Sequence, residues 1–162
     1  MSVHTETTDA EAAIMLDMLR RDHEKIQQLF DKFGETTTCS EKRDIVTAAI
    51  AALEIHTQLE EELLYPVWRR NIHDQDLMDE ACEDHYIVHL LTKELKNMSP
   101  EDKRFDVKFS ILSETVKHHI EEEEGKMFPQ AQKADWAWEE LTTQVIRRRQ
   151  SLEQKYGQVL GE

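Results

Sequence analysis

Two segments of the chain, HTQLEEELLYP at 56–66 and HIEEEEGKMFP at 119–129, share one unusual pattern. Each begins with a histidine, has a glutamate four residues later, and ends in an aromatic residue and a proline. Helical spacing places the histidine and this glutamate on the same face as apolar residues, Leu53 before the first segment and Val116 before the second. A helix that turns an imidazole and a carboxylate towards a core must satisfy them there, so the fold needs a buried polar site built from two helices.

The composition favours an all-α fold. Only 4 Gly and 3 Pro occur in 162 residues, and the many Leu, Glu, Lys and Ala residues lose little side-chain freedom in helices. Apolar residues recur at helical spacing in four long stretches separated by short polar connections. We therefore predict a flexible N-terminal tail at 1–9, an up-down-up-down four-helix bundle at 10–130, and an additional C-terminal helix within 131–162, packed on the bundle. Ser40 is expected to cap the second helix, and Ser99, followed by a proline, to begin the fourth.

Charge and hydropathy exclude several classes of partner. The 20 Lys and Arg residues against 34 Asp and Glu give a net charge of -14, which repels nucleic acid and anionic lipid. The longest apolar run, Ala48–Leu53, is too short to span a membrane, and the polar, acidic first residues do not resemble a signal sequence. Cys39 and Cys82 form no CxxC motif, so reduced thiols are expected. We expect a soluble cytoplasmic protein that binds neither nucleic acid nor membranes.

Every predicted helix of the bundle carries histidine on its inner face. His23 lies in the middle of the apolar stripe of the first helix, and His85 and His89 lie one turn apart on the third. Counting from the connections at about 1.5 Å per residue places these histidines and the two His-x-x-x-Glu pairs at a similar height. The converging side chains would be His23, His56, Glu60, His85, His89, His119 and Glu123.

Each feature also has an ordinary structural explanation. A single inward histidine is more often a hydrogen-bonded core residue than a ligand, and a run of glutamates is usually a solvated helix face. The residues assigned to solvent are Glu61, Glu62, Glu121 and Glu122 in the two segments, with His4 in the tail and His73 in a loop. A buried carboxylate, however, must be paired or bind a metal, and the inner faces offer no lysine or arginine to Glu60 or Glu123. A metal site therefore explains the pattern better.

The set of donors indicates two metal ions. Seven donors exceed the needs of one ion and suit two ions bridged by the two carboxylates. Imidazole and carboxylate without thiolate fit iron or manganese and permit zinc. A ferritin-like di-iron site would show Glu-x-x-His, but none of the eight histidines has a glutamate three residues before it. The sequence also contains no HExxH motif, nucleophile elbow or phosphate-binding glycine loop.

These residues resemble the hemerythrin-like, or HHE cation-binding, proteins over about residues 19–129, through DHEKI, HTQLEEELLYP, EDHYIVH and HIEEEEGKMFP. The resemblance implies a non-haem centre of two iron ions, bridged by the two glutamates and an oxo or hydroxo group, with the seven donors named above as ligands. His89 matches the oxygen-carrying branch of the family, whereas many relatives keep a single histidine on this helix. His118 has the spacing to Glu123 found in the oxygen carriers, but His119 is preferred because it is in register with the first segment. His118 would then lie outside the ligands or at the surface.

Two classes of function fit such a centre. The first is a binding module that carries, stores or senses dioxygen, another small diatomic ligand, or iron itself. The second is a di-iron enzyme that detoxifies peroxide or nitric oxide, or repairs iron centres. Ligation by His89 leaves one open coordination position and favours the first class, which is our leading expectation; loss of His89 as a ligand favours the second. A third possibility is a purely structural interaction bundle, although the sequence identifies no protein partner.

Overall fold

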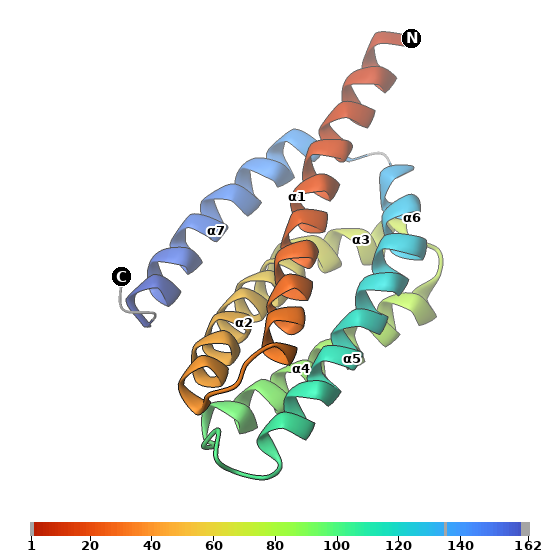
Figure 1. Ribbon diagram of the computed structural model, residues 1–162. Coiled ribbons are helices and arrows are strands. Elements are labelled where there is room, and N and C mark those ends of the chain that lie inside the picture. The colour runs from red at the N-terminus through yellow and green to blue at the C-terminus, as the bar shows by residue number, and fades with distance from the viewer. Residues whose placement is uncertain (1, 135, 160–162) are drawn as a thin grey trace.

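The computed structural model describes residues 2–134 and 136–159, and all regular structure within them is helical (Figure 1). The elements in chain order are α1 (Ser2–Gly34), α2 (Cys39–Leu59), η1 (Glu60–Leu64), α3 (Tyr65–Asn71), α4 (Gln75–Lys96), α5 (Phe105–Glu122), η2 (Glu123–Met127), α6 (Phe128–Gln132) and α7 (Trp138–Val159), where η marks a π-helical turn. The prediction of an all-α chain is confirmed. None of the described helices combines the length and the apolarity needed to cross a membrane.

The long helices lie in two neighbouring pairs. Figure 1 shows α1 beside α2, joined by a short connection at one end, and α4 beside α5, joined at the same end of the molecule. Helix α7 lies on the outside, where it packs against α1, α2 and η1. Residues 160–162, at the end of the predicted C-terminal segment, lie outside the described part of the chain. The predicted tail differs from the structure: α1 is helical from Ser2, and Met1 is not described.

Two helices begin at other residues than the sequence suggested. Thr38, not Ser40, caps α2: its hydroxyl accepts a hydrogen bond from the N–H three residues on, and the glutamate there bonds back in a capping box. Helix α5 begins at Phe105, six residues after the predicted start at Ser99. The side chains of Ser99 and Asp102 each accept a hydrogen bond from the backbone N–H two residues on, which stabilises turns instead of a helix.

The hydrophobic core consists of two clusters separated by a polar layer. On α1, Leu19 belongs to the first cluster and Ile26 to the second; on α2, Leu59 belongs to the first and Leu53 to the second. A histidine of the predicted site lies in each of these intervals, and on α4 His85 lies between Ala81 of the first cluster and Val88 of the second. Between Ile120 of the second cluster and Met127 of the first, the chain places Glu123. The two clusters exclude water above and below this layer, so its charged groups must find partners within it.

A π-helical turn widens the helix at the end of each repeated segment. The N–H of Tyr65 donates to the carbonyl of Glu60, and the N–H of Phe128 donates to that of Glu123, five residues back. The following residues, Pro66 and Pro129, have no N–H and would crowd the carbonyl four residues earlier in an ordinary α-helix. The wider turn relieves this crowding and lets the helix continue. Pro66 therefore does not end the helix, and each π turn starts at a glutamate of the predicted site.

Candidate metal centre

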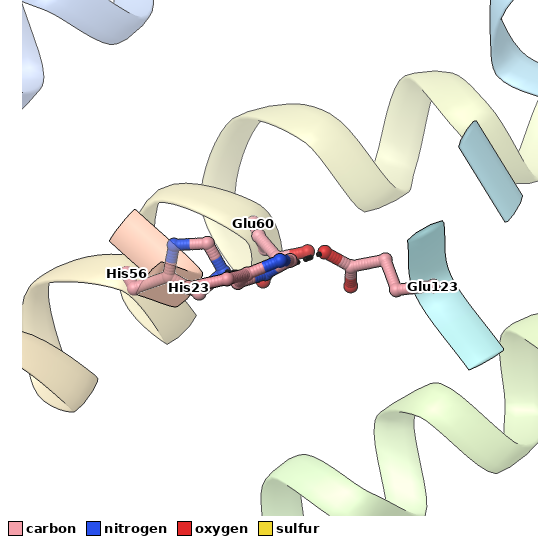
Figure 2. A group of neighbouring side chains, drawn as sticks. All are labelled: His23, His56, Glu60 and Glu123. Carbon is pink, nitrogen blue, oxygen red and sulfur yellow. Dashed lines mark hydrogen bonds and ion pairs between the residues drawn. The ribbon is translucent and has the colours of Figure 1, made fainter. Parts of the chain in front are cut away.

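Six of the seven predicted donors meet in one buried cluster between the two apolar clusters. None is more than 6% exposed to solvent. Figure 2 shows four of them, with two histidines and a glutamate from one pair of helices facing a glutamate from η2. The six residues are His23 on α1, His56 on α2, Glu60 at the start of η1, His85 on α4, His119 on α5 and Glu123 at the start of η2.

The cluster divides into two overlapping groups of potential ligands. His23 and His56 form one group and His85 and His119 the other, and the same two glutamates belong to both. Within each group the candidate ligand atoms all lie within 4.8 Å of one another. Two sites that share both carboxylates are the arrangement expected of two cations bridged by glutamates.

Each glutamate contacts histidines of both helix pairs. Glu60 Oε1 lies 2.6 Å from His56 Nε2 and 3.8 Å from His85 Nε2. Glu123 Oε1 lies 3.3 Å from His23 Nε2, and its Oε2 lies 3.0 Å from His119 Nε2. The carboxylates therefore stand between the two histidine pairs.

The outer nitrogen of every histidine faces a carboxylate. The Nδ1 atom of His23 lies 3.1 Å from Glu124, and that of His56 lies 3.0 Å from Asp22. In the other pair, Nδ1 of His85 lies 3.7 Å from Glu61 and Nδ1 of His119 lies 3.4 Å from Asp84. A carboxylate here favours a proton on Nδ1, which leaves the lone pair of Nε2 directed into the cluster. Metal-binding histidines have this arrangement.

The inner nitrogens converge in a way that fits a cation. His23 Nε2 and His56 Nε2 are 3.1 Å apart, and His85 Nε2 and His119 Nε2 are 3.3 Å apart. With both outer nitrogens protonated, two lone pairs would face each other at this distance. Both side-chain oxygens of Glu60 and one of Glu123 are buried without an acceptable hydrogen bond. Such atoms are costly to bury unless a proton or a metal ion binds between them.

The pKa values of the clustered residues in the metal-free protein also indicate a site that attracts cations. Burial alone would lower the pKa of His119, but the charge of Glu123 and the hydrogen bond to Asp84 outweigh it and raise this pKa to about 10. The pKa of His56 is likewise raised well above its usual value, against burial, by Glu60 and by Asp22. Burial and the charge of Glu123 raise the pKa of Glu60. The cluster thus draws in protons when it holds no metal, and cations would have to displace them.

The structure does not bring His89 to this cluster. Its side chain is 44% exposed, and its Nε2 lies 2.9 Å from Glu61 at the surface. The buried stripe of α4 runs through Ala81, His85, Val88, Thr92 and Leu95. Because this stripe alternates steps of three and four residues, a residue one position after Val88 points away from the core. The prediction that His89 faces inward was therefore wrong.

The structure adds detail to two further expectations about side chains. Glu61, which was assigned to solvent, bridges His85 and His89, and these contacts outweigh partial burial and lower its pKa. His118 is exposed on α5, so the structure places His119 in the cluster instead. Arg149 of α7 donates two hydrogen bonds to Asp22.

A tyrosine that the sequence reasoning did not select lies in one half of the cluster. The hydroxyl of Tyr65 donates to Glu123 Oε2 at 2.6 Å and lies 3.3 Å from Nε2 of both His85 and His119. Burial raises its pKa well above 10, with the charges of Glu123 and Glu60 adding to the effect, so the group stays protonated. The other half has Phe128 at the corresponding position of the repeat, stacked on His23. At this position of the repeat the two halves therefore differ by one hydroxyl.

The sequence did contain a signal for the outer carboxylates. Aspartate precedes both His23 and His85, and each aspartate contacts the histidine of the neighbouring helix in its own pair. A glutamate likewise follows both Glu60 and Glu123, and each contacts a histidine of the opposite pair. The repeat thus extends beyond the ligands to the residues that orient them.

Comparisons with known proteins agree with this geometry. A family model described as the hemerythrin HHE cation binding domain matches residues 14–131. A curated protein named DNA nickase, from Nostoc sp. (strain PCC 7120), is 27% identical over 130 residues, which cover 78% of this chain. The chain spans only about a third of that relative, 36% of its length. No solved structure gives a significant match.

Proposed function

The chain belongs to the hemerythrin HHE cation-binding domain family, and from this premise we propose that it is a cytoplasmic di-iron protein that consumes hydrogen peroxide. The ions would be held by the six clustered residues, and α1, α2, α4 and α5 would form the up-down-up-down bundle typical of the family. The family match establishes a cation-binding domain. Iron, the count of two ions, the reaction and the location are our proposals.

The shared glutamates support two ions. Each half of the cluster offers two imidazole nitrogens of its own and two carboxylates that it shares with the other half. One ion would use one half and leave two inward imidazoles without a partner. The donors contain no thiolate, which suits iron and manganese better than a structural zinc site.

The position of His89 favours the enzyme over the oxygen carrier. Reversible oxygen binding, our leading expectation from the sequence, required His89 as a ligand so that only one coordination position stayed open. With His89 turned to Glu61 at the surface, each ion would receive four protein donors and keep open positions for water or substrate. This is the single observation that carries the proposal.

The protein side chains supply binding, orientation and a proton. When bound, two iron ions would supply the electron transfer that converts two molecules of peroxide into two of water and one of dioxygen. Tyr65 holds a proton on its hydroxyl beside the shared carboxylate, where it can donate to an oxygen atom that leaves as water. The outer carboxylates fix the histidine rings, and the two apolar clusters limit access to small molecules.

A direct experiment compares the reactions of the iron-loaded protein with peroxide and with dioxygen. Protein loaded with ferrous iron under argon would be mixed with hydrogen peroxide in one sample and with air-saturated buffer in another. We expect catalytic evolution of dioxygen from peroxide and no oxygen adduct that disappears on deoxygenation. A visible band that forms with air and reverses over many cycles, without peroxide turnover, would restore the carrier as the better proposal.

The name of the Nostoc relative, DNA nickase, suggests one further assay. With a net charge of -14 the chain should repel DNA, and the match covers a minor part of that relative. We expect the iron-loaded protein to relax supercoiled plasmid no faster than the same amount of free iron. Faster nicking by the protein would give DNA chemistry a place in its function.

A further inference from the structure

One surface cluster of potential metal ligands lies outside the buried centre. Glu80 and Asp84 on α4 and His118 on α5 have ligand atoms within 4.8 Å of one another. Glu80 and His118 are exposed, and the side chain of Asp84 is 17% exposed. One imidazole and two carboxylates are donors that first-row divalent cations accept.

This surface cluster connects directly with the buried centre. Asp84 accepts a hydrogen bond from Nδ1 of His119, so one carboxylate serves both places. A narrow cleft has Glu80, Asp84 and Glu122 at its outer end and the buried His119 and Glu123 at its inner end. We call it the uptake cleft. Glu123 is 1% exposed, and its Oε1 atom lies 3.3 Å from His23 Nε2 without forming a hydrogen bond of acceptable geometry.

In the other half of the repeat, an arginine side chain occupies the corresponding position beside the aspartate. Asp22 contacts His56 as Asp84 contacts His119, and the two aspartate side chains are equally exposed at 17%. Arg149 of α7 donates to Asp22 at 2.9 and 2.6 Å, and a guanidinium group there repels an approaching metal ion. No described lysine or arginine forms an ion pair with Asp84; the nearby cation at the cleft, Lys126, pairs with Glu122.

We infer that Glu80, Asp84 and His118 form a capture site for divalent transition-metal ions, from which the ions pass through the uptake cleft to the buried centre. The inference rests on the proposed function only in requiring that the buried centre takes up cations. The uptake cleft has a volume of about 10 Å³, room for roughly one water molecule. A hydrated ion must therefore lose most of its water before it enters, and the three surface donors replace that water at the mouth.

The inference is tested by the rate of loading, with Co²⁺ as the probe. Bound Co²⁺ gives visible absorption without redox chemistry, so stopped-flow spectra report filling of the buried centre. The test variant is Glu80→Gln with His118→Ala, since neither residue is one of the six buried donors. The matched control is Glu83→Gln with His73→Ala, which removes the same charge and also one exposed histidine.

The test variant should take up Co²⁺ about tenfold more slowly than both wild type and control. Tenfold is the lower end of the range over which local charge changes association rates. All three proteins should reach the same final content of tightly bound Co²⁺. Equal loading rates in the two variants would overturn the capture site and leave the proposed function intact. Failure of the wild type to retain any Co²⁺ would overturn both.

Discussion

Replacing Tyr65 with phenylalanine tests how the protein itself contributes to the proposed reaction. The change removes one hydroxyl, which donates to Glu123 at 2.6 Å in a fully buried place. The ring should keep its position, because Phe128 fills the corresponding site of the repeat and is buried at 1% exposure. The variant therefore isolates the hydroxyl from the packing.

The magnitude follows from the partners that the hydroxyl leaves behind. Glu123 is ionised in the metal-free protein, since contacts with His119 and His23 outweigh burial and hold its pKa well below the usual value. A hydrogen bond to a charged group contributes about 1.5–3 kcal/mol, so the free energy of unfolding of the metal-free variant should fall by about 2 kcal/mol. In the iron-loaded protein the loss should be smaller, because bound cations neutralise the carboxylate. Peroxide consumption should fall by about a hundredfold, as expected when a positioned proton donor is lost.

Dioxygen evolution and urea unfolding, measured on iron-loaded and metal-free samples, check both numbers. Tyr86→Phe is the matched control, because Tyr86 is 61% exposed on the surface of α4. It should behave like wild type. If Tyr65→Phe retains its iron and consumes peroxide at the wild-type rate, Tyr65 is not the proton donor and the asymmetry between the two halves has no catalytic meaning.

The remaining predictions concern the ligands and pH. Elemental analysis should find about one iron per chain in His85→Ala but about two in His89→Ala, and equal losses would return His89 to the ligand set. Iron affinity would be measured by competition with a chelator. Glu60→Ala should weaken iron binding by more than the roughly 10–100-fold expected for loss of a carboxylate that only orients a ligand. Glu121→Ala, at an exposed position, should leave iron binding unchanged. The metal-free protein should lose stability as pH rises, because the pKa of His119 is about 10 when folded and about 6.5 when unfolded. Its contribution, on the order of 5 kcal/mol, is complete below pH 6.5 and disappears towards pH 10. Urea unfolding that shows constant or rising stability over this range would contradict the contacts of His119.

Local patterns predicted the buried site well, for a physical reason. A helix can place an imidazole and a carboxylate inside only at positions that share a face with apolar residues, and this rule selected His56, Glu60, His119 and Glu123 directly. His23 followed from the middle of its apolar stripe. These five positions depend on helical periodicity alone, which the structure keeps up to the start of each π turn.

The expectations that differ from the structure depended on long-range or subtle geometry. His89 was assigned inward because it lies one turn from His85, but the buried stripe of α4 is too narrow to include it. The contact between Arg149 and Asp22 was not expected at all, because it requires α7 to pack across α1, which no pattern within α7 specifies. The start of α5 depended on a choice between a helix cap and local turns at Ser99, and both use the same kind of hydrogen bond.

The central claim is that the six buried residues hold two iron ions as one bridged pair. Iron content and Mössbauer spectra of protein loaded with ferrous iron under argon, then oxidised, test it most directly. We predict about two irons per chain and a diamagnetic ground state that arises from coupling through the bridge. One isolated paramagnetic iron per chain, or preferential retention of a single zinc ion, would contradict the account.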